Sequence, residues 1–222
     1  MKKRFIAAGA FGVLFLLLIL LVKTADVAQI GPAGTVIGLS HINGAVSGFF
    51  GINMLWYDIT EALGIAALAV AAVFALAGVF QLVRRKSLKR VDVRILALGA
   101  LYIVVLALYA LFEKAPVNYR PVLMPGCDLP EASFPSSHTV LICTVMGSAA
   151  MLLKYYIKNP GLCAVLRAVC MLIIAVTVLG RLFSGVHWLT DIIGGVFLSA
   201  ALLLLYSGVL EKTDAERKGK TV

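Results

Sequence analysis

The chain has 222 residues, of which 61% are hydrophobic and 14% are charged, and its formal net charge is +9 at pH 7. A soluble domain of this length has too few polar residues to cover so much apolar surface, which excludes an ordinary water-soluble globular protein. The basic excess alone would suggest nucleic acid, but its placement along the chain, described below, excludes that class.

Six apolar runs follow one another along the chain, at about 5–22, 59–83, 92–112, 138–157, 162–182 and 188–210. Each is close to the ~20 residues that a helix needs to cross a ~30 Å hydrocarbon layer. The first run resembles a secretion signal, but its length of about 18 residues exceeds the ~7–15 of a cleaved signal, so we expect a retained helix. The fold class is therefore predicted to be all-α, with a single six-helix membrane domain over residues 1–210.

Counted from an inside N-terminus, all but four of the 20 Lys and Arg residues fall on one side of these spans, the exceptions being Lys23, Lys114, Arg120 and Arg181. Because Lys and Arg are enriched in cytoplasmic loops, we predict that both termini are cytoplasmic. Residues 211–222 are predicted to form a polar, disordered cytoplasmic tail. The basic excess then reflects topology, and we expect no nucleic-acid partner.

Two external segments connect the spans, at 24–58 and at 113–136. Residues 42–57 mix aromatic residues with glycines, so we expect them to lie along the interface as an anchor or as a lid beside the site. His41 has no obvious partner there and receives no role. Asp58 and Glu61 resemble a capping box at the start of the second span, a structural role. Prolines throughout 113–136 predict a fixed, irregular loop.

Three short motifs carry most of the remaining polar chemistry: Arg120-Pro121, Pro135-Ser136-Ser137-His138, and Arg181 followed by His187 and Asp191. Ionisable groups are costly near a membrane interior, so they tend to mark function. All three motifs fall in or beside the second external loop and the turn after the fifth span. We therefore expect them to lie on the same side of the membrane.

The residue types in these motifs suit phosphate chemistry. The guanidinium groups of Arg120 and Arg181 match phosphate oxygens, and Lys114 can add a third positive charge. Ser136 and Ser137 open the fourth span, where free backbone N–H groups bind anions. The alternative roles are snorkelling for the basic residues and helix capping for the serines; the capping and binding roles are compatible.

The histidines supply the reactive groups. His187 and Asp191 are four residues apart and share one helix face, so the carboxylate can hold one ring nitrogen and leave the other free to attack. His138 can act as the general acid toward the leaving group. The alternative is that each histidine is an interfacial residue with its hydrogen bonds satisfied.

These motifs resemble those of the type 2 phosphatidic acid phosphatase family, which run K-x6-R-P, P-S-G-H and S-R-x5-H-x3-D. The resemblance covers 114–191 and implies metal-independent hydrolysis without a cofactor, a phosphohistidine on His187, Asp191 as its orienting partner and His138 as the acid. It also implies phosphate binding by Arg120, Arg181, Lys114 and the Ser136 region. The chain departs from the pattern at three places: five residues separate Lys114 from Arg120, Ser137 replaces glycine and Gly180 replaces serine.

The expected function is hydrolysis of a lipid phosphate or diphosphate at the outer face of the cell membrane. Undecaprenyl diphosphate, phosphatidylglycerophosphate and phosphatidic acid all fit, with a weak preference for an isoprenoid diphosphate, and the oligomeric state is left open. A phosphotransferase using the same site is an alternative, as is a transporter. An intramembrane serine protease is disfavoured because Leu182 stands where its G-x-S-G motif needs glycine. A metalloenzyme would need a third ligand beside His187 and Asp191.

Overall fold

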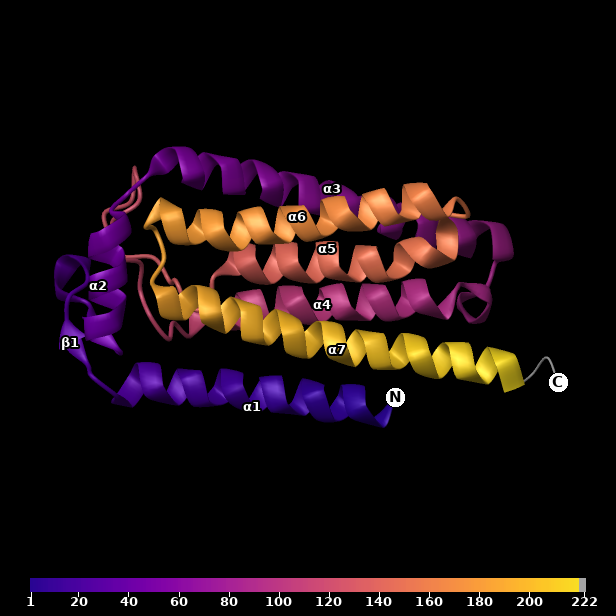
Figure 1. Cartoon of the computed structure of the whole chain (residues 1–222), viewed down its shortest axis with the longest axis horizontal. Helices are drawn as coiled ribbons and strands as arrows, with labels where there is room; N and C mark the ends of the chain where they lie inside the picture. The colour runs from indigo at the N-terminus through magenta and orange to yellow at the C-terminus, as the bar shows by residue number, and fades with distance from the viewer. Residues whose placement is uncertain (220–222) are drawn as a thin grey trace.

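The computed structural model describes residues 1–219, with side chains described to residue 216. Within these residues, six helices are long and apolar enough to cross a membrane: α1 (Lys2–Thr24), α3 (Met54–Arg85), α4 (Val93–Lys114), α5 (Ser137–Tyr156), α6 (Pro160–Ser184) and α7 (Leu189–Gly219). They run along the long axis of the molecule as one bundle (Figure 1). The predicted all-α, multi-pass membrane fold is confirmed.

The last helix is longer than expected. It continues past residue 210 to Gly219, so the prediction of a disordered tail is wrong for residues 211–219; residues 220–222 lie outside the described residues. Asp214 explains the difference, because it accepts hydrogen bonds from Arg94 Nη2 (2.5 Å) and from the Tyr155 hydroxyl (2.6 Å). These contacts hold the final turns of α7 against α4 and α5.

The start of α1 and the end of α7 lie on the same side of the bundle. The Met1 amino group lies 2.8 Å from Oε2 of Glu211 on α7, and both of these helix ends lie away from the end that carries α2 (Figure 1). Between α3 and α4, the short helix η2 (Leu88–Arg90) lies in the basic loop at the end where α1 starts. That this end is cytoplasmic stays a prediction from the charge distribution.

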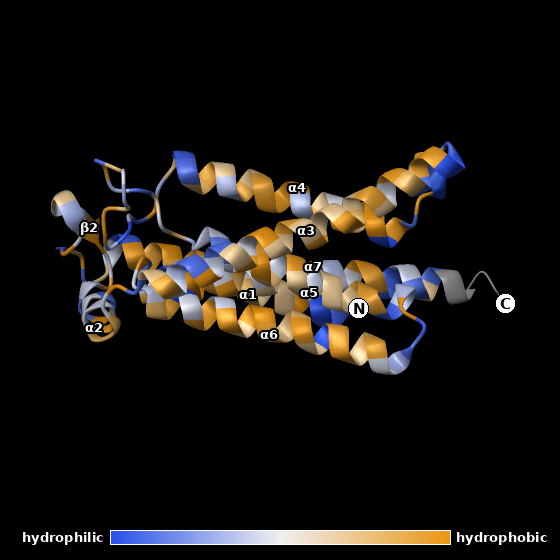
Figure 2. Ribbon diagram, turned by 90° about the horizontal axis from the view of Figure 1, so that it is seen from above, coloured by the Kyte–Doolittle hydropathy of each residue, from blue (hydrophilic) through white to orange (hydrophobic). Residues whose placement is uncertain are grey.

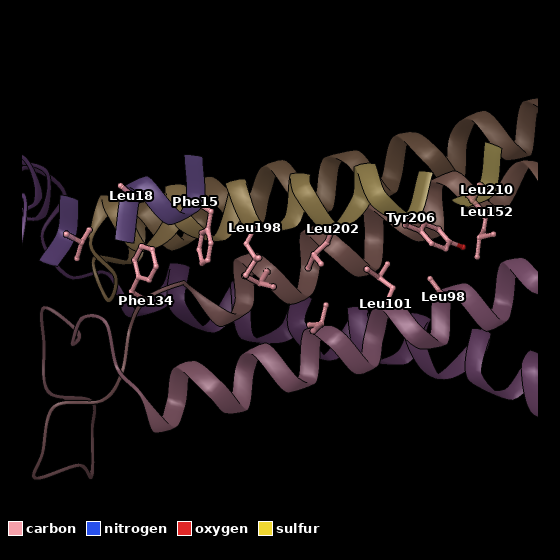
Figure 3. Packing of buried hydrophobic residues seen from close by; sticks show 13 residues of the cluster. Phe15, Leu18, Leu98, Leu101, Phe134, Leu152, Leu198, Leu202, Tyr206 and Leu210 are labelled. Carbon is pink, nitrogen blue, oxygen red and sulfur yellow. The ribbon is translucent and has the colours of Figure 1, made fainter. Parts of the chain in front are cut away.

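Helix α5 forms the centre of the bundle. Of its most apolar stretch, 67% is buried inside the protein, against 11% for α3, so α3 presents most of its side chains outward. Figure 2 shows hydrophobic colouring along much of the length of the spanning helices. Many of these apolar side chains are exposed, where lipid would cover them. The main core cluster joins α1, α4, α5 and α7 (Figure 3), and in it the Phe134 ring lies 5.7 Å from the ring of Phe15.

The segment after α1 forms a small cap at the far end of the bundle (Figure 1). It contains β1 (Ala28–Gln29) and β2 (Val36–Ile37), paired antiparallel, the short helix η1 (Pro32–Gly34), and α2 (Ser40–Phe50). Asp26 accepts hydrogen bonds from the Ser40 hydroxyl and from the backbone N–H of His41. His41 therefore has a partner that the sequence did not reveal, since its Nδ1 lies 2.6 Å from Asp26 Oδ1.

The starts of α4 and α3 are capped by side chains. Asp92 caps α4 and accepts a hydrogen bond from the backbone N–H of Arg94. The predicted capping box at Asp58 and Glu61 is wrong, because α3 already begins at Met54, four residues before Asp58. Its cap is Asn53, whose side chain accepts from the N–H of Trp56. Asp58 and Glu61 are therefore interior residues of α3.

Candidate active site

The second and third motifs meet where α5 begins beside the first turn of α7. The backbone N–H of Ser136 donates to the backbone carbonyl of Asp191, at 3.0 Å. This approach depends on Gly194 and Gly195. A Cβ on Gly194 would lie 2.6 Å from the Phe134 ring, and one on Gly195 would lie 2.8 Å from Thr139 Cβ. The two adjacent glycines thus allow the two helices to pack closely.

The prediction that His187 and Asp191 share one helix face is wrong, because α7 begins at Leu189 and His187 lies in the turn before it. The turn nevertheless places the His187 ring between Asp191 and Arg120. Its Nδ1 is 3.5 Å from Asp191 Oδ2, and its Nε2 is 3.5 Å from Nη1 of Arg120. Asp191 is fully buried, and its Oδ2 accepts a hydrogen bond from the backbone N–H of Trp188 at 3.0 Å. A carboxylate beside Nδ1 favours the tautomer with its proton there, which leaves the Nε2 lone pair directed toward the arginine.

Arg120 is positioned by the loop between α4 and α5. The loop folds back on itself: the N–H of Arg120 donates to Glu131 O, and the N–H of Ser133 donates to Asn118 O, both at 3.0 Å. The indole N–H of Trp188 donates to Tyr119 O at 2.6 Å and ties the loop to the third motif. The predicted fixed loop is thus an irregular hairpin that carries Arg120 to His187.

The surroundings of His187 keep its ring neutral. The residue is only 4% exposed. Burial, followed by the positive charges of Arg120 and Arg181, holds the pKa of the His187 imidazole well below its usual value of 6.5. Desolvation disfavours the charged imidazolium, and nearby cations disfavour it further. A neutral imidazole has a free lone pair and is the form that can act as a nucleophile.

The two remaining basic residues of the motifs, Arg181 and His138, both contact the carboxylate of Glu61. Arg181 Nη2 donates to Glu61 Oε1 at 2.7 Å, and His138 Nε2 lies 3.2 Å from Glu61 Oε2. Two further nitrogens of Arg181, Nε and Nη1, are buried and have no hydrogen-bond acceptor among the described residues. Buried guanidinium donors normally have partners, so these nitrogens suit an anion.

Glu61 is therefore a site residue that the sequence reasoning missed. The signal was present, because an acidic residue within an apolar membrane run marks function by default. The capping-box pattern with Asp58 concealed it. Asn118 and Ser133 were missed as well: both side chains are buried and adjoin the carboxylate of Asp191. They come from an irregular loop in which no periodic pattern singles out individual residues.

The remaining predicted site residues differ in their placement. Ser136 is buried at the N-cap of α5, where its hydroxyl accepts from Thr139 Oγ1 at 3.0 Å, and Ser137 is partly exposed. Lys114 is the exposed last residue of α4. Within residues 1–216, no hydrogen bond or ion pair joins Lys114 to another predicted site residue. Its part in phosphate binding stays a prediction.

An apolar groove between the helices reaches His138. Its volume is about 320 Å³, and its walls come from α3, α4, α5 and the end of the loop, among them Leu68, Leu106, Phe112, Leu141 and His138. Figure 2 shows α4 leaning away from the other helices toward the α2 end, which is where this groove lies. A hydrocarbon chain matches such walls chemically.

Positive charge at this site comes from arginine side chains. In the part of the chain that the structure describes, no group of three or more His, Cys, Asp or Glu side chains is arranged to hold a metal ion. Each of the two guanidinium groups forms an ion pair with a carboxylate. Arg120 Nε lies 2.9 Å from Glu131 Oε2, and Arg181 Nη2 lies 2.7 Å from Glu61 Oε1.

The comparisons with known proteins agree with the motifs. Residues 113–214 match the PAP2 superfamily. The fold is similar to the crystal structure of the first transmembrane PAP2 type phosphatidylglycerolphosphate phosphatase from Bacillus subtilis, with a TM-score of 0.63 and 19% sequence identity over 93% of this chain and 96% of that chain. No curated protein matches the sequence. The segment that carries the three motifs therefore matches the PAP2 superfamily, which supports a relationship of this chain to the type 2 phosphatidic acid phosphatases.

Proposed function

We propose that this protein hydrolyses a phosphate from a lipid phosphate or diphosphate through a phosphohistidine intermediate on His187. The match to the PAP2 superfamily supports a phosphatase that acts on lipid phosphates. The observation that carries the finer proposal is the His187 ring itself. Its Nδ1 faces the Asp191 carboxylate and its Nε2 faces the Arg120 guanidinium, 3.5 Å away. The attacking atom and a phosphate-binding group thus lie side by side.

In the first step, Arg120 and Arg181 bind the phosphate oxygens and the Nε2 atom of His187 attacks phosphorus. The bond from phosphorus to the leaving oxygen breaks, and that oxygen takes a proton from His138. In the second step, water attacks the phosphorus of the phosphohistidine and gives its proton to His138. Inorganic phosphate leaves, and both histidines return to their starting forms. The arginines stabilise the charge that spreads over the phosphoryl oxygens in each transition state.

The proposed substrate is a lipid because the groove beside His138 is apolar and opens between membrane helices. A hydrocarbon chain in that groove would place its phosphate at the start of α5, beside the site. Undecaprenyl diphosphate, phosphatidylglycerophosphate and phosphatidic acid are the candidates. The structural neighbour from Bacillus subtilis is a phosphatidylglycerolphosphate phosphatase. The outward orientation expected from the charge distribution favours an isoprenoid diphosphate, on the outer face of the cytoplasmic membrane.

The experiment is release of inorganic phosphate by the purified protein in detergent, with each of the three candidate lipids, in the presence of EDTA. We expect release with at least one of them and no dependence on added metal. Loss of activity with EDTA that a divalent ion restores would contradict metal independence. Absence of release from all three lipids, with a folded protein, would contradict the proposed reaction.

Transfer of the phosphoryl group to an acceptor other than water is the alternative that uses the same site. Both reactions share the phosphohistidine, and they differ only in the nucleophile of the second step. Chromatography of the products, formed with and without an added acceptor lipid, distinguishes them. Hydrolysis predicts inorganic phosphate as the main product in both cases, whereas a phosphotransferase would yield a phosphorylated acceptor.

A further inference from the structure

We propose that the Glu61 carboxylate binds the same hydrogen-bond donors, on Arg181 and His138, that bind the substrate phosphate. Glu61 and the phosphate would then compete for these two side chains. Glu61 would then be a positioning residue that leaves the donors when substrate binds and returns to them when inorganic phosphate is released. This inference rests on the proposed function, because it concerns the same phosphate site. It adds a residue from α3, outside the three motifs.

The contacts of Glu61 match those of a phosphate. One carboxylate oxygen, Oε1, accepts from Arg181 Nη2 at 2.7 Å, while the other, Oε2, lies 3.2 Å from His138 Nε2. These two groups come from different motifs, on α6 and α5. An anion with two or more oxygens is needed to contact both at once. The carboxylate is such an anion, and so is the phosphoryl group that the site is proposed to bind.

Arg181 is the fixed member of this pair and Glu61 the movable one. The Arg181 side chain is 0% exposed, and its guanidinium carbon lies 5.1 Å from the centre of the Tyr57 ring. The Glu61 side chain is 37% exposed. A partly exposed glutamate can turn toward water without unpacking its neighbours, whereas a fully buried arginine cannot. Phosphate would therefore displace the carboxylate and keep the arginine where it is.

Two glycines allow α3 to pack closely enough to bring Glu61 to Arg181 and His138. A Cβ on Gly180 would lie 2.7 Å from Thr60 Cγ2, so α3 approaches α6 closely one residue before Arg181. A Cβ on Gly64, one turn after Glu61, would lie 3.0 Å from the His138 ring. The glycine at 180, where the family pattern has serine, is thus the residue that allows Thr60 and its neighbour Glu61 to approach Arg181.

The Glu61 carboxylate and the phosphate cannot both bind at Arg181, because both are negatively charged. A phosphate dianion and a carboxylate on the same guanidinium would repel each other, and this repulsion is strong where little water screens it. Glu61 therefore lowers the affinity of the site for phosphate. Its return after hydrolysis would help to expel inorganic phosphate, a step that often limits turnover. A residue that only supported Arg181 would have the opposite effect, because its loss would weaken phosphate binding.

The test is the affinity for inorganic phosphate of wild-type protein and of Glu61→Gln, measured by thermal shift during a phosphate titration. Glutamine keeps the shape and an acceptor oxygen but removes the charge. We expect the variant to bind phosphate about tenfold more tightly, the effect of one charge-assisted hydrogen bond. Asp58→Asn is the matched control, because it removes an exposed carboxylate from the same helix; its phosphate affinity should equal that of wild type.

Equal or weaker phosphate binding by Glu61→Gln would overturn the proposal. If the variant is unstable alone, it should be recovered folded when purified with phosphate, and Glu61→Ala should behave in the same way; failure of both variants to fold even with phosphate would indicate a purely structural partner and also overturn it. Lipid hydrolysis by the wild type, measured in parallel, tests the proposed function separately. Hydrolysis without the affinity gain refutes this inference alone. The affinity gain without hydrolysis supports the competition and refutes the function.

Discussion

The backbone N–H of Ser136 donates a 3.0 Å hydrogen bond to the backbone carbonyl of Asp191, 55 residues further along the chain. This single contact joins the start of α5, which carries His138, to the start of α7, which carries the His187–Asp191 pair. Because it joins backbone to backbone, it fixes the relative position of the two motifs without depending on side-chain rotamers. The following predictions concern the residues that this junction brings together.

Replacing His187 by alanine should abolish turnover, with a loss in kcat of at least about 10³-fold, because the proposed nucleophile is gone. Asp191→Asn should cost on the order of 10²–10⁴-fold, because the amide no longer fixes the proton on Nδ1 of His187. Phosphate release from lipid substrate measures both. Rapid quenching with labelled substrate should trap an acid-labile phosphoprotein in wild type and none in His187→Ala. Full activity of the alanine variant would refute the nucleophile assignment.

The pH dependence should reflect the neutral state of His187. Protonation removes the lone pair, so activity is lost as the pH falls through the pKa of this residue. Because burial and the arginines hold that pKa below 6.5, the acid limb of the kcat/KM profile should lie below pH 6.5. Arg120→Gln removes one of the charges that lower the pKa, so its acid limb should move to higher pH. A wild-type limb above pH 6.5 would contradict this assignment.

Gly195→Ala should destabilise the protein by about 1–3 kcal/mol, because its Cβ would lie 2.8 Å from Thr139 Cβ and one helix must shift. The shift would also strain the contact between Ser136 and Asp191, so kcat should fall as well. Gly12→Ala on α1 is the control, since its Cβ would meet nothing within 4 Å. Thermal unfolding in detergent and phosphate release measure the two effects. Equal unfolding temperatures for the two variants would show that close packing at Gly195 is unimportant.

Lys114→Ala should have a small effect, confined to substrate binding. The residue is exposed at the end of α4, and solvent-exposed charges contribute little through water. We expect KM to rise no more than about fivefold with kcat unchanged, corresponding to ~1 kcal/mol. Arg120→Ala should reduce kcat/KM by at least about 10²-fold in the same assay, because its guanidinium lies beside the proposed nucleophile. Similar losses in both variants would indicate that Lys114 reaches the phosphate.

Asn43→Ala should loosen the cap over the site. The Asn43 side chain is fully buried and donates to Gly38 O at 2.9 Å and to Thr190 Oγ1 at 3.0 Å, while its oxygen accepts from the N–H of Thr190. Its loss leaves buried groups unpaired, which costs about 1–3 kcal/mol. Hydrogen exchange of α2 and of the first turn of α7 should therefore increase. His41→Ala is the control, because its side chain contacts the loop residue Asp26 and is almost fully exposed.

The sequence by itself determined the membrane fold and indicated most of the candidate site residues. Apolar runs of spanning length leave few architectures open, because every backbone polar group in lipid must be paired within a helix. The spacing of Arg181, His187 and Asp191 likewise identifies a local unit, because few residues separate its members, although His187 lies in the turn before α7 and not on the helix that carries Asp191. These features depend on short stretches of chain, and a short stretch is what a sequence pattern describes.

The tertiary structure alone decided which side chains complete the site. Glu61 resembles a helix cap when only its neighbour Asp58 is considered, and it meets Arg181 and His138 only because α3 packs against α5 and α6. Gly180 departs from the serine of the family motif, and only the structure gives the reason: Thr60 fills the space that a side chain at 180 would need. Asn43 contacts Thr190 across 147 residues of chain. Such contacts depend on how whole helices pack, and no local spacing encodes that arrangement.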